Sequence, residues 1–119
     1  MNYVIGDTAL IKDIPQSRHG DFVWTLPFVD VAADGTETET DLTDCEFAFV
    51  VFGLDGTTEI ASLEIGTGID VSDNIVTVSI DNADLIADYV KGCKYPYYLT
   101  YTNAAGHTKC LFEGKFITT

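Results

Sequence analysis

Two histidines, His19 and His107, carry the side chains best suited to move protons near neutral pH. Both fall in segments of loop composition, and neither has a Ser or Cys beside it in a nucleophile pattern. A catalytic pair would require these two distant loops to converge. We therefore predict no catalytic residue and no enzymatic activity.

Side-chain oxygens of Asp70, Asp73 and Asn74, with Asp81 nearby, could supply ligands to Ca²⁺. Their spacing does not match an EF-hand loop. The same residue types form turns by bonding their own backbone, which is the interpretation we favour. A second acidic group is interpreted as a solvated loop, and it comprises Asp30, Asp34, Glu37, Glu39 and Asp41. We predict no metal site and no cofactor.

The three cysteines, Cys45, Cys93 and Cys110, are widely spaced, with no C-x-x-C motif and no histidine at metal-ligand spacing. A zinc site is therefore not expected. Alternation places Cys110 on the apolar face of the last strand, with Phe112 and Phe116, as a small buried residue. A disulfide involving Cys45 or Cys93 stays open, although synthesis in a reducing cytoplasm favours free thiols.

Tyrosines could instead bind sugar by stacking, since four of them lie between residues 95 and 101. In a strand, Tyr95, Tyr97 and Tyr101 share a face with Leu99, which predicts that they belong to the core. Tyr98 alone then faces outward. A glycan platform would depend on this single residue.

Charge is the most unusual bulk property, because 19 acidic residues against 6 basic ones give a net charge of −13. No Lys or Arg occurs between Arg18 and Lys91. Such a surface repels phosphate backbones, so we predict no nucleic-acid binding. No apolar run approaches the roughly 20 residues that a membrane helix needs. The acidity favours solubility and self-repulsion, with a basic partner or bound divalent cations as the alternative.

A chain of 119 residues is expected to form one domain, spanning residues 1–119. Alternation and turn residues predict about seven strands, within residues 2–11, 21–29, 45–52, 58–65, 75–80, 95–101 and 108–117. Residues 12–20 and 30–44 have the composition of loops. The opening strand is expected to bend at Gly6-Asp7. Trp24 is predicted to be a central core residue. Asp81 or Asn82 is expected to cap a short helix over residues 83–90. The pattern is typical of an all-β, antiparallel sandwich.

The segment 45–52 is apolar on both faces. Phe47, Phe49 and Val51 face one way, while Val50 and Phe52 face the other with Ala48. Such a strand is either covered on both sides or presents its outer face to a partner.

The order and spacing of several motifs resemble the immunoglobulin-like β-sandwich modules of tailed-bacteriophage virions. These motifs are Asp21-x-x-Trp24, Asp41-Leu42-Thr43-Asp44 before a Phe-x-Phe-x-Val strand, Ile69-x-Val71-x-x-Asn74-x-Val76-x-Val78-x-Ile80, Gly92-x-x-Tyr95-x-Tyr97-x-Leu99, and Gly106 followed by Gly114-x-Phe116-Ile117. The resemblance covers residues 20–119. Pro96, at the start of the penultimate strand, departs from the pattern.

The resemblance implies a non-enzymatic structural protein of the virion, made in the host cytoplasm. Its expected role is a head decoration or fibre-anchoring adaptor that docks to a capsid or tail protein, because no shaft sequence follows Thr119. The alternatives are a tail or baseplate component and a glycan-binding adhesion module. A homo-oligomer on the virion and a surface glycan are the other partners it allows. The candidate contact residues are Tyr3, Val4, Ile5, Val50, Phe52 and Tyr98.

Overall fold

The secondary structure is almost entirely β. The computed structural model describes residues 2–6 and 8–119. Their elements are β1 (Leu10–Ile11), β2 (Ile14–Gln16), β3 (Phe22–Pro27), β4 (Val29–Val31), β5 (Glu37–Glu39), β6 (Glu46–Phe52), β7 (Glu59–Ile65), β8 (Gly68–Ser72), β9 (Ile75–Ile80), α1 (Asn82–Asp88), β10 (Lys94–Thr102) and β11 (Thr108–Thr118). The predicted all-β class, with a short helix before the last hairpin, is confirmed.

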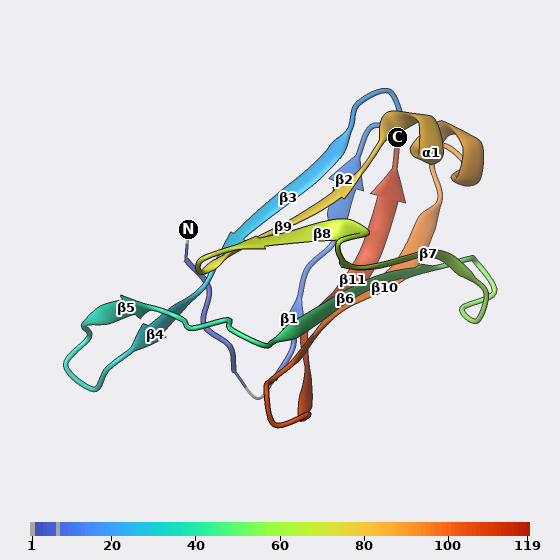
Figure 1. The fold of residues 1–119 in the computed structure, drawn as a ribbon. Helices are drawn as coiled ribbons and strands as arrows, with labels where there is room; N and C mark the ends of the chain where they lie inside the picture. The colour runs from blue at the N-terminus through green and yellow to red at the C-terminus, as the bar shows by residue number, and fades with distance from the viewer. Residues whose placement is uncertain (1, 7) are drawn as a thin grey trace.

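One large sheet has the strand order β1-β11-β10-β6-β7-β8-β9-β3, with β2 also paired to β11. Most neighbours are antiparallel, but β1 and β2 run parallel to β11, and β7 runs parallel to β8. The sheet is therefore mixed, where the sequence predicted antiparallel pairing throughout. β4 and β5 form a separate two-stranded hairpin that projects from the body (Figure 1).

The large sheet curls so that its two ends pack against each other (Figure 1). Phe22 of β3 packs on Phe116 of β11, with ring centroids 5.1 Å apart, and on Phe49 of β6 at 5.8 Å. Trp24 of β3 lies 4.8 Å from the ring of Phe112. These contacts join strands that are far apart in the strand order, so the core lies inside the curl.

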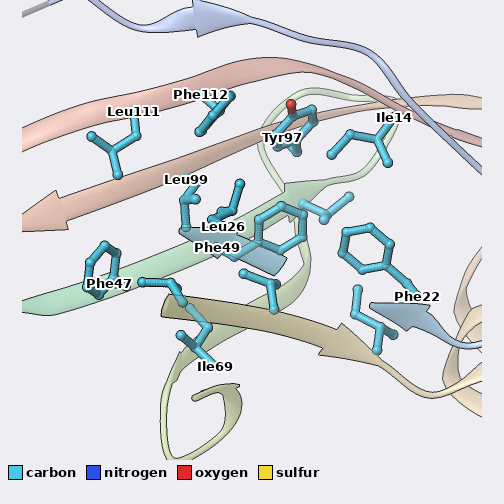
Figure 2. Close-up of a cluster of buried hydrophobic side chains, with 14 of the residues drawn as sticks. Ile14, Phe22, Leu26, Phe47, Phe49, Ile69, Tyr97, Leu99, Leu111 and Phe112 are labelled. Atoms are coloured by element: carbon cyan, nitrogen blue, oxygen red, sulfur yellow. The ribbon is translucent and has the colours of Figure 1, made fainter. Parts of the chain in front are cut away.

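Alternation decides which side chains enter this core. Phe47, Phe49 and Val51 of β6 are at most 2% exposed, and Leu99 of β10 is fully buried. Figure 2 shows Phe47, Phe49 and Leu99 among other apolar side chains. Trp24 is only half-buried and packs against the cluster from its margin, so the prediction that it is central was wrong.

Both segments predicted as loops contain strands. Within residues 12–20, β2 pairs with β11 through three residues centred on Pro15, because a parallel edge strand needs few main-chain donors. Within residues 30–44, β4 and β5 pair around a turn at Asp34-Gly35. Of the predicted opening strand, the structure gives a bridge at Tyr3 and the short β1, while Asp7 of the predicted bend lies outside the described residues.

A register shift between Leu99 and Thr100 changes the faces of β11. Phe112 pairs with Leu99, whereas Cys110 pairs with Thr100, so Leu111 is the extra residue and is buried beside Phe112. Cys110 is half-buried, which corrects its predicted position on the apolar face with Phe112. All three cysteines are free thiols.

The short helix starts where it was expected, but its cap comes from elsewhere. Asp81 is the N-cap residue and makes no side-chain cap bond. The Asn82 N–H instead donates to Oδ1 of Asp21, at 2.8 Å. The helix ends at Asp88, two residues before the predicted end at residue 90. Across the described residues, no helix is long and apolar enough to span a bilayer.

Candidate functional site

The outer face of β6 and β10 carries one row of side chains across four strands. Val50 is the register partner of Tyr98 on β10 and of Ser62 on β7, and Tyr98 in turn pairs with Glu113 on β11. Cross-strand partners in antiparallel pairs lie on the same face of a sheet. Because Phe49 and Leu99 face the core, this row faces away from it.

Three of the predicted contact residues meet at the centre of this face. The rings of Phe52 and Tyr98 lie edge to face, with centroids 5.5 Å apart. Val50 is only 4% exposed, so it forms the floor, whereas Phe52 and Tyr98 stay partly exposed. Pro96 precedes Tyr98 on the same face, and β6 pairing begins at Tyr97, so the missing N–H of Pro96 breaks none of the β6–β10 register pairs. We call Val50, Phe52 and Tyr98 the docking face.

Acidic side chains surround the docking face. Glu113 is paired with Tyr98, Glu59 with Phe52, and Glu64 with Ala48. All three glutamates are exposed. Two bases share the face: Lys115 lies opposite Pro96, and Lys94 lies two residues before Pro96 on β10. The surface thus has an apolar, aromatic centre and a mainly acidic rim, a combination that can take up a partner with an apolar centre and basic rim.

The other predicted contact residues, Tyr3, Val4 and Ile5, lie elsewhere. The Tyr3 N–H donates to the Pro27 carbonyl and its carbonyl accepts from the Val29 N–H, both at 2.8 Å. The Tyr3 ring packs edge-on against Phe112, at 5.3 Å. Since Phe112 faces the core, the structure does not bring this segment together with the docking face.

A groove of about 360 Å³ runs beside this first segment. Val4 and Leu10 line it and are about half exposed, at 53% and 52%, while Ile5 is half-buried against the core. The groove is mostly apolar. It is a second surface, apart from the docking face, on which apolar side chains stay accessible.

The residues considered for catalysis and metal binding stay apart. His107 precedes β11, whereas His19 follows Arg18, whose backbone N–H donates to the Thr119 carbonyl beyond the other end of β11. β11 has 11 residues and therefore spans roughly 33 Å, at about 3.3 Å per residue. The two histidines therefore lie at opposite ends of the molecule.

The residues considered as Ca²⁺ ligands, which the sequence analysis interpreted as turn formers, do not form a cluster. Asn74 is buried, and its amide donates to the Phe28 carbonyl at 2.8 Å. Within residues 2–6 and 8–119, no group of three or more His, Cys, Asp or Glu side chains could hold a metal ion. The Asn74 side chain instead links the turn before β9, by this hydrogen bond, to the residue that follows β3.

Sequence reasoning missed the glutamates of the rim. Glu64 and Glu113 are isolated acids in strands and carry no motif. Their position follows only from the register that pairs them with Ala48 and Tyr98. A correct hairpin register would have been the one signal able to find them.

Comparison with known proteins adds no relative, because no family model matches the chain and no curated protein matches its sequence. The functional interpretation depends on the surfaces described above.

Proposed function

We propose that this chain is a non-enzymatic structural protein of a tailed-bacteriophage virion, a head decoration protein or fibre-anchoring adaptor that docks to another virion protein. The observation that carries the proposal is the docking face, where Phe52 and Tyr98 stay partly exposed over a buried Val50. An aromatic centre inside a polar rim is the usual anatomy of a protein interface.

The fold we propose in finer detail is an immunoglobulin-like sandwich. One layer would contain β2, β11, β10, β6 and β7, and the other β3, β9 and β8. The ring contacts of Phe22 with Phe49 and Phe116 across the core support two facing layers. Further support comes from Tyr95 at the start of β10, whose hydroxyl accepts a hydrogen bond from the Val90 N–H five residues upstream. Such a tyrosine corner is characteristic of immunoglobulin-like domains.

Charge favours a different protein as the partner over a second copy. The net charge of −13 makes copies repel each other, and the rim glutamates Glu59, Glu64 and Glu113 would face their own kind in a symmetric contact. A partner with Lys or Arg around an apolar centre would gain electrostatic steering. A capsid or tail subunit with that surface is the partner we propose.

The groove beside Val4 and Leu10 is the weaker docking site. Strand addition there would need free main-chain groups, and both backbone groups of Tyr3 are already bonded to Pro27 and Val29. Docking on the sheet face needs no free strand edge.

A glycan-binding module is the competing function, and the partial exposure of Tyr98 favours it. Sugar stacking needs an accessible ring face. Both rings of the pair border a carboxylate that could accept a hydrogen bond from a sugar hydroxyl, since Tyr98 pairs with Glu113 and Phe52 pairs with Glu59. A glycan array probed with the intact chain and with Tyr98→Ser distinguishes this function.

The experiment that tests the proposal is the mass of the purified chain by light scattering, alone and mixed with purified virions or capsid shells. We expect a monomer that binds particles at a fixed ratio per capsid subunit. A stable homo-oligomer that does not bind the particles would contradict the decoration role and favour a tail ring, baseplate or glycan-binding assembly.

A further inference from the structure

A second pocket, unrelated to the docking face, lies between α1 and the strands β7 and β9. Its volume is about 510 Å³, within the usual range for small-molecule sites. Ile60, Leu63 and Ile80 form its apolar part. Gly68 closes one side, and a Cβ there would come within 2.8 Å of the Leu63 side chain. The pocket therefore has an apolar wall built from β7 and β9.

The opposite wall is acidic, because Asp81, Asp84 and Asp88 all line the pocket. Asp84 and Asp88 are four residues apart, so they lie on the same face of α1 and repel each other. Asp88 is also the last residue of the helix, where a negative charge opposes the helix dipole. Within residues 2–6 and 8–119, no cation forms an ion pair with these carboxylates. No ion pair within the described residues therefore offsets the repulsion between Asp84 and Asp88.

Arg18 contacts the chain just beyond the end of α1, but through the backbone. Arg18 donates through Nη1 to the carbonyl of Tyr89, at 3.1 Å, and does not line the pocket. It supports the end of α1 without neutralising the acidic wall.

Tyr89 gives an independent indication that this pocket takes up a ligand. The residue lines the pocket and is only 3% exposed, yet its buried hydroxyl has no hydrogen-bond partner among the residues that the structure describes. Burial raises the pKa of Tyr89, and the nearby charges of Asp88 and Asp84 raise it further. A buried polar group without a partner is costly, and a bound ligand could satisfy it.

We propose that this pocket binds an organic cation: an ammonium or guanidinium group paired with Asp84 and Asp88, on an apolar stem that packs against Ile60 and Leu63. Such a ligand would relieve the repulsion within α1 and offer a polar partner to Tyr89. A free amine and a Lys or Arg side chain of a partner peptide share this chemistry. A bare metal ion would leave the apolar wall unused.

The test is an NMR titration of the intact, isotope-labelled chain with two probes, phenethylammonium and the capped peptide acetyl-Gly-Lys-Gly-amide. We expect saturable shifts at the amides of Ile60, Leu63, Gly68 and residues 81–89 with at least one probe. Response to the amine alone identifies a small-molecule site, and response to the peptide identifies a side-chain site. The neutral analogue 2-phenylethanol should bind much more weakly. No shifts with either cation, or equal binding of the alcohol, would overturn the proposal.

Matched variants separate the pocket from general charge. Asp84→Asn with Asp88→Asn should weaken binding of the responding probe about tenfold, as expected for two partly exposed ion pairs. Glu37→Gln with Glu39→Gln removes the same charge from the exposed β5 and should leave binding unchanged. Tyr89→Phe should weaken binding without loss of thermal stability, because the hydroxyl has no partner to lose. Equal affinity in all three variants would contradict the site.

Discussion

The Tyr95 hydroxyl accepts a hydrogen bond of 2.7 Å from the backbone N–H of Val90. This bond crosses the corner at which the chain leaves α1 and enters β10. The Tyr95 ring is 3% exposed and packs edge-on against Tyr89, with centroids 5.1 Å apart. One side chain thus fixes the backbone of the corner and joins it to the core.

Removal of the Tyr95 hydroxyl tests whether its hydrogen bond stabilises this corner of the chain. Tyr95→Phe keeps the ring but leaves the Val90 N–H without its acceptor, so we expect a loss of about 1 kcal/mol in the free energy of unfolding. Tyr98→Phe is the matched control, because the Tyr98 hydroxyl makes no hydrogen bond within the described chain, and it should change stability by less than about 0.5 kcal/mol. Urea denaturation measures both. Equal stability of the two variants would show that the hydrogen bond from the Val90 N–H to the Tyr95 hydroxyl does not stabilise the protein.

Gly114 marks a close approach between β11 and the segment before β2. A Cβ at this position would collide with the carbonyl oxygen of Lys12 and come within 2.8 Å of its carbonyl carbon. Backbone atoms cannot rotate away, and Lys12 is held by its N–H bond to the Glu113 carbonyl. Gly114→Ala should cost about 3 kcal/mol. Gly20→Ala, where no atom lies within 4 Å, is the control.

Thermal denaturation of both alanine variants measures this difference. A melting temperature of Gly114→Ala as high as that of Gly20→Ala would mean that the segment at Lys12 does not approach β11 as described.

The hydrogen bonds to Asp55, in the turn between β6 and β7, should make the stability of the protein depend on pH. The Thr58 hydroxyl donates to Asp55 at 2.6 Å, and the Thr58 and Thr57 N–H groups add bonds of 2.9 and 3.0 Å, which together lower the pKa of Asp55 to about 2. Because the folded pKa lies below the unfolded value of about 3.9, this stabilisation is present above pH 4 and is lost as the pH falls through 2.

The carboxyl carbon of Asp55, followed by NMR, should titrate with a midpoint near pH 2. Thr58→Val removes the strongest donor and should raise the midpoint toward 3.9, whereas Thr67→Val, outside this turn, should not. A wild-type midpoint near 4 would show that the turn does not form these bonds.

The sequence predicted those parts of the fold that depend on alternation within one strand. The buried set Phe47, Phe49 and Val51 was assigned correctly, and so was the hairpin turn at Asp55-Gly56. Each assignment needs only the side-chain period and local turn residues.

The missed features depend on partners far along the chain. The parallel pairing of Pro15 with Ile117 uses the main chain and leaves no pattern in the side chains. The cap of α1 comes from Asp21, 61 residues away from Asn82. The register shift at Leu99 moved Cys110 relative to Phe112. Within the docking face, alternation predicted that Val50 and Phe52 share a side, but only packing shows that Val50 is buried and Phe52 is not.

The central claim is that Phe52 and Tyr98 form the contact with another virion protein, and the most direct measurement compares two variants in binding to virions. Tyr98→Ser removes one of the two partly exposed rings of the docking face, while Val23→Ser removes an apolar side chain that is 60% exposed on β3, outside the docking face. Sedimentation of labelled chain with purified virions measures bound protein per particle. We expect Tyr98→Ser to lose at least about tenfold in affinity, as a central aromatic contact should, and Val23→Ser to bind like wild type. Undiminished binding of Tyr98→Ser would contradict the account.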